Sequence, residues 1–100
     1  MNDSDFNKEK LTKRLEELKP ILSKEYKVKE IGYFGSYATG EETDLSDIDI
    51  LVEFKEPLGW KFFELKDFLE EQLGRSVDLV TRNALKEQLR ESILSKTIYV

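Results

Sequence analysis

Two carboxylates stand close together at the start of an apolar run, where they could hold metal ions. Asp47 and Asp49 are two positions apart, and the run 48–54 alternates in hydropathy with the period of a β-strand. Both side chains are therefore expected on one face of the strand, with Cα atoms about 6.6 Å apart. At that separation two carboxylates can bracket a pair of divalent cations.

A third carboxylate, Asp78, interrupts another apolar run, 77–81. The same alternation places it on the face opposite Val77 and Leu79. If this run and 48–54 form neighbouring strands, the three carboxylates converge and repel one another unless cations lie between them. The chain contains no Cys and no His, so the ligands would all be oxygen, which favours Mg²⁺, Mn²⁺ or Ca²⁺ over zinc.

A short segment bounded by glycines, residues 35–40, has the composition of a phosphate-binding turn. Gly35 permits close backbone approach, Ser36 adds a hydroxyl donor, and a short helix after them would offer N–H groups to an anion. Gly40 lets the chain turn into the polar loop 41–46. Phosphate donors and carboxylates are therefore expected at the same edge of the sheet.

Each of these signals also has a structural explanation. An Asp-x-Asp triplet arises easily by chance, and Asp47 alone reads equally well as a turn or cap residue. Asp49 and Asp78 are harder to explain in this way, since Asp is depleted in strands. The ordered set, rather than any one member, indicates a site.

The first element that must support this site is a long amphipathic helix from about residue 5 to residue 24. Ser4 or Asp5 is its expected N-cap, and Pro20 should kink it or split off a short turn.

Two further helices are expected, from about 58 to 73 with Gly74 as C-cap, and from about 85 to 93. The apolar stripe of the last helix should belong to the core, or should form a docking surface if it stays partly exposed. That stripe comprises Leu85, Leu89 and Ile93.

Strands are expected at 30–34, 48–54 and 77–81, with 98–100 as a short strand or a docked tail. These elements predict one small α/β (α+β) domain over residues 1–100, with a mixed sheet and helices mainly on one face. The other face is then left for the site.

Aromatic side chains recur along the expected strands and helices, and core packing explains most of them better than base stacking. They are Tyr33, Phe34, Trp60, Phe62, Phe63 and Phe68. Tyr37 differs because it lies in the phosphate segment, where it could pack against a nucleotide.

Composition narrows the possible functions. The net charge is −5 and the pI is about 4.8, which argues against a track for duplex nucleic acid. The lack of Cys and His excludes thiolate nucleophiles, disulfides and His-based triads. No apolar run approaches the length of a membrane span, and the amino-terminal residues do not resemble a signal peptide. We therefore expect a cytoplasmic protein with no membrane partner.

In order and spacing, these motifs resemble the signature of the DNA polymerase β nucleotidyltransferase superfamily. They are Gly35-Ser36, Ser46-Asp47-Ile48-Asp49 and Val77-Asp78-Leu79. The most similar branch is the minimal nucleotidyltransferases, which pair with HEPN-domain proteins in toxin–antitoxin modules. The resemblance implies a palm fold.

By that resemblance, Asp47 and Asp49 hold two Mg²⁺ or Mn²⁺ ions and Asp78 completes the ion on the acceptor side. Gly35 and Ser36 would cradle the β- and γ-phosphates, in a nucleotide-binding segment that also includes Tyr37 and Thr39. One residue departs from the family pattern, because Thr39 stands where members often carry Arg. The change removes a fixed cation near the triphosphate.

The resemblance also implies an activity, the transfer of AMP from ATP to a hydroxyl, expected to be a tyrosine of a HEPN toxin in a hetero-oligomeric complex. Two alternatives remain open. The chain could neutralise its partner by binding alone, or it could serve RNA ends or a small molecule with an acceptor domain on another chain.

Other families that use Asp-x-Asp fit less well. Phosphatases of the haloacid dehalogenase type carry Thr or Val at the position where this chain has Leu51. Sugar-nucleotide glycosyltransferases are normally much longer than this chain. An EF-hand fails because Ile48 and Ile50 occupy positions between the expected oxygen ligands.

Overall fold

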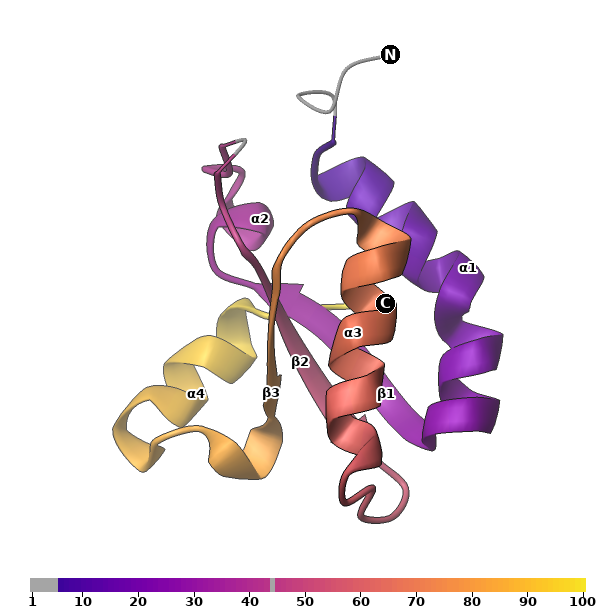
Figure 1. The fold of residues 1–100 in the computed structure, drawn as a ribbon. Coiled ribbons are helices and arrows are strands. Elements are labelled where there is room, and N and C mark those ends of the chain that lie inside the picture. Colours follow the sequence, from indigo (N-terminus) through magenta and orange to yellow (C-terminus); the bar gives the residue numbers. More distant parts are fainter. Residues whose placement is uncertain (1–5, 44) are drawn as a thin grey trace.

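The period-two and helical patterns of the sequence become a four-stranded sheet flanked by helices (Figure 1). The computed structural model describes residues 6–43 and 45–100. Its elements are α1 (Lys8–Tyr26), β1 (Val28–Phe34), α2 (Ser36–Thr39), β2 (Ile48–Phe54), α3 (Lys61–Leu73), β3 (Val77–Thr81), the 3₁₀ helix η2 (Arg82–Ala84), α4 (Glu87–Lys96) and β4 (Ile98–Tyr99).

The strand order is β3-β2-β1-β4, with β2 antiparallel to β1 and parallel to β3. The short strand β4 pairs antiparallel with the other side of β1. The strands expected at 48–54 and 77–81 are therefore neighbours, which is the adjacency that the three-carboxylate hypothesis requires. The mixed sheet and the α/β fold class are confirmed.

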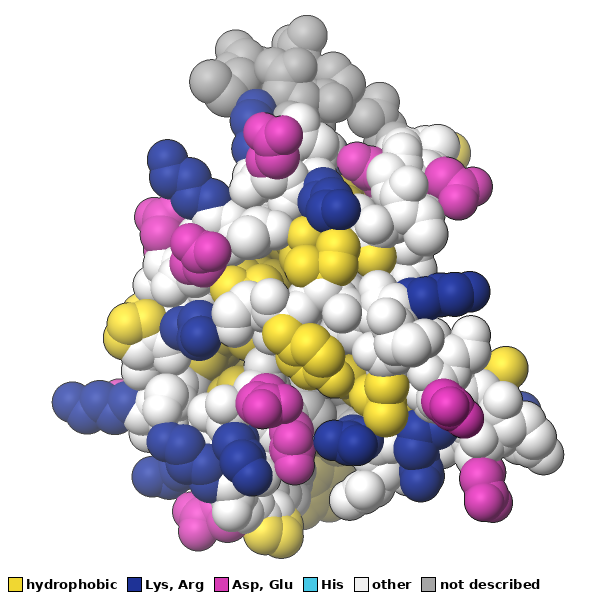
Figure 2. Space-filling model, turned by 180° about the vertical axis from the view of Figure 1, so that it is seen from behind, with side chains coloured by type: hydrophobic (Ala, Val, Ile, Leu, Met, Phe, Trp, Pro, Cys, Tyr) yellow, Lys and Arg dark blue, Asp and Glu magenta, His cyan; other side chains and the backbone are white. Residues whose placement is uncertain are grey.

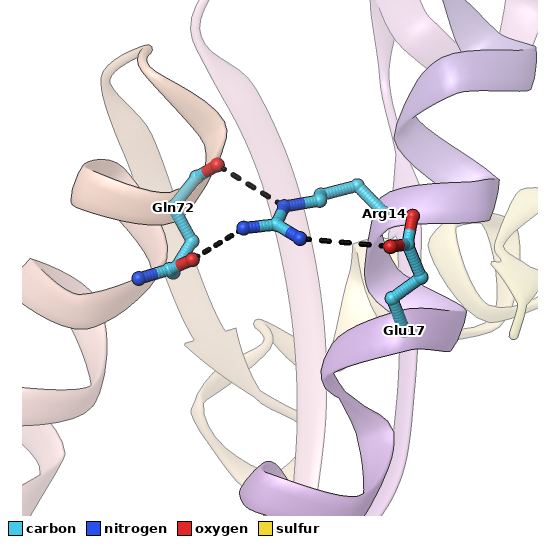
Figure 3. A network of polar contacts seen from close by, with 3 residues as sticks. All are labelled: Arg14, Glu17 and Gln72. Atoms are coloured by element: carbon cyan, nitrogen blue, oxygen red, sulfur yellow. Dashed lines mark hydrogen bonds and ion pairs between the residues drawn. The ribbon is translucent and has the colours of Figure 1, made fainter.

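One face of the sheet carries the core. Helices α1 and α3 lie on this face (Figure 1), and their leucines pack with the strand residues that point toward them. Ile48, Ile50 and Val52 of β2 are fully buried here. Arg14 ties the two helices together, because it donates to the backbone and side-chain oxygens of Gln72 and also pairs with Glu17 at 3.8 Å (Figure 3).

The opposite face is partly covered, although the sequence had suggested that it would be open. The chain leaves β3 at one edge of the sheet and returns as β4 at the other, so α4 crosses this face (Figure 1). Leu51, which points to this side, is only 3% exposed. Most helical residues still lie on the core face, as predicted.

Helix α1 differs in detail from its prediction. It begins at Lys8, where the Asn7 side chain accepts a hydrogen bond from the Lys10 N–H at 3.1 Å. Ser4 and Asp5, the expected caps, lie outside the described residues. The helix also runs through Pro20 without splitting. Both Pro20 and the residue four positions earlier are exposed, so water can satisfy the carbonyl that loses its partner.

Two aromatic residues and the α4 stripe are more exposed than predicted. Trp60 and Phe63 are 86% and 57% exposed, because α3 begins only at Lys61 and turns its first residues outward. No residue of α4 is buried, and Leu89 is 53% exposed. Tyr33 is buried as expected, and Gly74 caps α3 as predicted. No helix within residues 6–43 and 45–100 has the length and apolarity to cross a membrane.

Candidate active site

The carboxylates of β2 and β3 come together because the two strands run in parallel register. Asp49 pairs with Asp78 across the ladder, and parallel partners project to the same face about 4.8 Å apart. The register is set at its start, where the Ile48 N–H donates to the Ser76 carbonyl at 2.9 Å. Asp47 precedes β2 by one residue and is exposed, as is Asp78, whereas Asp49 is half-buried.

A side chain from α3 fixes the start of β3. The Val77 N–H donates to Glu70 Oε2 at 2.9 Å, and Lys66 pairs with the same oxygen at 3.4 Å. The backbone hydrogen bond lowers the pKa of Glu70, with Lys66 as a weaker cause, so the carboxylate is held in its charged form. Glu70 thereby positions the residue immediately before Asp78.

The surroundings of Asp49 disfavour the negative charge of its carboxylate. Burial raises the pKa of its carboxyl group, and the negative charges of Asp78 and Asp47 raise it further. Two neighbouring negative charges therefore act on Asp49 at this edge of the sheet. Such a concentration of uncompensated carboxylates is typical of functional sites.

Gly35 is packed directly against Asp49. A Cβ at Gly35 would lie 2.1 Å from Asp49 Oδ2, and the backbone there has φ +69° and ψ −146°. Residues with a side chain avoid that conformation. Both observations require glycine here, so the turn after β1 and the carboxylate of β2 form one unit. This confirms that the Gly-Ser turn and the aspartates lie at the same edge.

The segment after Gly35 forms the short helix α2. Ser36 opens this helix, so its N–H group has no acceptor within it. The Thr39 hydroxyl donates to the Ser36 carbonyl at 3.2 Å, which stabilises the turn.

The position of Tyr37 disagrees with the expectation that its side chain packs against a nucleotide. Its side chain is 1% exposed and stacks edge-on against Phe6 at 5.9 Å between ring centroids. It therefore anchors α2 to the core and is not available to pack against a nucleotide. The alternation of exposed and buried positions in so short a helix could not be read from the sequence.

A cavity of about 420 Å³ opens beside Gly35, a size within the usual range for small-molecule sites. The α2 segment forms one wall through Ser36 and Thr39, and α4 forms another through Ser92 and Lys96. Sequence reasoning missed these α4 residues. The available signal was topological, since a chain that passes from one edge strand to the other must cross the sheet, and the leucines of α1 and α3 already cover the core face.

The donor chemistry at this edge suits a divalent cation. All candidate ligands are carboxylate oxygens, and their mutual repulsion is relieved by a positive ion. Among the described residues, no group of three or more acidic side chains is arranged so that it could hold a metal ion without moving. Asp47 and Asp78 are exposed, so packing does not fix their rotamers.

The described residues on the face drawn in Figure 2 form no broad basic track. Figure 2 shows basic and acidic side chains interspersed over the back of the molecule, around a central group of hydrophobic side chains. This distribution agrees with the net charge of −5 and does not resemble a surface that follows a nucleic-acid backbone.

Known proteins are similar to this chain in sequence. A relative in Methanocaldococcus jannaschii, named as a protein adenylyltransferase, is 55% identical over 84 residues, which span 82% of this chain and 86% of the relative. The protein adenylyltransferase MntA of Thermococcus cleftensis is 45% identical over 94 residues, which span 86% of this chain and 95% of MntA.

Solved structures are similar to this chain in fold. A structure described as a minimal nucleotidyltransferase aligns with a TM-score of 0.82 and 34% identity over 95% of this chain and 97% of its own. A toxin–antitoxin structure with AMP-PNP aligns with a TM-score of 0.66 and 29% identity over 94% of this chain and 72% of its own. The nucleotidyltransferase domain family matches residues 15–100. With the site geometry described above, these matches show that the chain belongs to the nucleotidyltransferase domain family.

Proposed function

We propose that this nucleotidyltransferase moves AMP from ATP to a hydroxyl of a partner protein, a tyrosine of a HEPN-domain toxin, and silences the toxin. The observation that carries the proposal is the register of Asp49 with Asp78 beside Gly35, which brings two of the three candidate carboxylates to the Gly-Ser turn. The names of the similar proteins support adenylylation and a toxin–antitoxin setting. The reaction would take place in the cytoplasm, where ATP is abundant.

Each part of the site has a role in this reaction. Ser36 holds the β- and γ-phosphates through its hydroxyl and its N–H group at the start of α2, so that the α-phosphorus faces the carboxylates. Asp78 is exposed on the edge strand β3, where an acceptor from another molecule can approach. It takes the proton of the acceptor hydroxyl as the oxygen attacks the α-phosphorus. The bond to the β-phosphate oxygen breaks, and pyrophosphate leaves.

Asp47, Asp49 and Asp78 would hold Mg²⁺ or Mn²⁺. When bound, such ions neutralise the charge of the phosphates and stabilise the attacking and leaving oxygens. The raised pKa of Asp49 is the feature of this chain that a cation would reverse.

The acceptor hydroxyl would come from a partner, because the solved structures similar to this chain include toxin–antitoxin complexes.

Incubation of the chain with a co-expressed HEPN partner, α-labelled ATP and Mg²⁺ should label the partner at a tyrosine. Asp47→Asn combined with Asp49→Asn should abolish the label. The matched control is Asp67→Asn, which removes an exposed aspartate of α3, away from the site, and should leave labelling unchanged. Absence of label from the wild-type protein with either Mg²⁺ or Mn²⁺ would overturn the proposal.

A second candidate function is neutralisation by binding alone. It is favoured by the lack, among the described residues, of an acidic group arranged to hold a metal ion without moving, and by the uncharged Thr39 in the phosphate segment. The double asparagine variant separates the two. If it still binds and neutralises the partner as well as the wild type does, catalysis is dispensable.

A further inference from the structure

Lys96, at the last position of α4, lines the cavity beside Gly35 together with residues of the phosphate-binding segment. The residues that line the cavity include Gly35, Ser36 and Thr39 from the phosphate-binding segment, and Ser92 and Lys96 from α4. Ser92 and Lys96 are four residues apart and so share one face of α4. Two segments far apart in the sequence therefore meet around one volume.

The phosphate-binding segment has no cation of its own. Residues 35–40 read Gly-Ser-Tyr-Ala-Thr-Gly, with no Lys or Arg. A triphosphate carries several negative charges, and hydrogen bonds from neutral donors are weaker than those from an ammonium or guanidinium group. A cation for this segment must come from elsewhere in the fold.

Lys96 meets that need. Among the described residues that line the cavity, only Lys96 and Glu41 are charged. Among the described residues, Lys96 takes no part in the ion pairs of Arg14 with Glu17 and of Lys66 with Glu70. Without Lys96, the charge on the cavity wall would be that of the Glu41 carboxylate alone, which repels an anion.

We propose that Lys96 is the phosphate-binding cation of this enzyme, supplied by α4 to the β- and γ-phosphates held at Gly35 and Ser36. The inference rests on the proposed nucleotidyl transfer and assigns to α4 a role in nucleotide binding. The proposal gives α4 a function on the face of the sheet that carries Asp49, although no residue of α4 is buried.

A simpler explanation exists for a lysine at this position. A positive charge in the last turn of a helix interacts favourably with the helix dipole. In that case, loss of Lys96 would lower the stability of the protein slightly but would not distinguish nucleotides by their number of phosphates. The test therefore compares ATP with AMP.

The experiment measures dissociation constants of the full chain for the non-hydrolysable analogue AMP-PNP and for AMP, by calorimetry with Mg²⁺. Lys96→Ala and Lys96→Gln should weaken AMP-PNP binding by about tenfold and change AMP binding by less than about twofold. Lys86→Ala is the matched control, since it removes an exposed lysine beside the other end of α4 that does not line the cavity. It should change neither constant. Circular dichroism establishes that each variant is folded.

Restoration of the charge from the phosphate-binding segment completes the test. Thr39→Arg in the Lys96→Ala background should recover most of the lost AMP-PNP affinity. If Lys96→Ala and Lys96→Gln bind AMP-PNP like the wild type, or lose AMP and AMP-PNP affinity alike, the assignment of Lys96 is overturned while the proposed transfer stands. If the wild-type protein binds no AMP-PNP, both proposals are overturned.

Discussion

The two faces of strand β2 differ in what their residues contact and in how those residues affect the stability of the fold. On one face, Ile48, Ile50 and Val52 have no exposed surface and pack in the core. On the other, Asp49 is half-buried beside two further carboxylates, and its pKa is raised. Residues of the first face stabilise the fold. Those of the second face bring charges together that repel one another, and we therefore assign them to function rather than to stability. Substitutions on the two faces should therefore separate activity from stability.

The largest effect is expected at Asp49. Asp49→Asn should lower transfer activity by about a thousandfold, since it removes a charge on which stabilisation of the reacting phosphate depends. In EDTA the variant should be slightly more stable than wild type at neutral pH. The raised pKa means that the wild-type carboxylate destabilises the fold above the pKa of the unfolded chain, and that this loss is relieved as the pH falls through the folded pKa.

Label transfer measures the activity of Asp49→Asn, and urea denaturation in EDTA measures its stability. A variant that keeps wild-type activity would mean that the charged face of β2 has no catalytic role. A large loss of stability would mean that Asp49 belongs with the core face instead.

The next effect is expected at Gly35. Gly35→Ala places a Cβ against Asp49 Oδ2 and forces strained backbone, so activity should fall by about a hundredfold, with about 1–3 kcal/mol of lost stability. Gly59→Ala is the control, because Gly59 also has a positive φ but a Cβ there meets no atom within 4 Å. If both variants lose activity equally, backbone strain rather than the contact with Asp49 accounts for the effect.

On the core face, the comparison predicts the reverse pattern. Leu15→Ala should destabilise the protein by about 2–5 kcal/mol because it leaves a cavity under the sheet, while activity per folded molecule stays near wild type. Ile21→Ala, on the same helix but 43% exposed, should change stability by less than about 1 kcal/mol. Thermal and urea unfolding measure both, and equal losses would show that the Leu15 contact is not part of the core.

The smallest effect is expected at Glu70, which links the core side to the site. Its lowered pKa means that its contribution to stability is present above the unfolded pKa and is lost as the pH falls through the folded value. Glu70→Ala should therefore flatten the acid side of the stability profile, whereas Glu70→Gln keeps an acceptor for the Val77 N–H. Denaturation between about pH 3 and pH 7 tests this. An unchanged profile in Glu70→Ala would contradict it.

The sequence predicts the core face better than the site face, for a physical reason. A strand buried on one side repeats every two residues, so Ile48, Ile50 and Val52 reveal the orientation of β2 and, with it, that of Asp49. The adjacency of β2 and β3 depends on hydrogen bonds between distant segments, such as that from Ile48 to Ser76, and no local pattern shows them.

Residues in short or terminal elements were the least predictable. Tyr37 reads as a residue of the phosphate segment, yet one turn of helix is enough to direct it into the core. Lys96 reads as an ordinary solvated lysine, and only the crossing of α4 over the site face brings it to the cavity. Trp60 and Phe63 read as core residues because hydrophobicity alone does not show where a helix begins.

The most direct measurement of the central claim is a crystal structure of the full chain with Mg²⁺ and AMP-PNP. The account predicts metal ions ligated by Asp47, Asp49 and Asp78, with the β- and γ-phosphates at Gly35 and Ser36. Nucleotide bound elsewhere, or metal held without these three carboxylates, would contradict it.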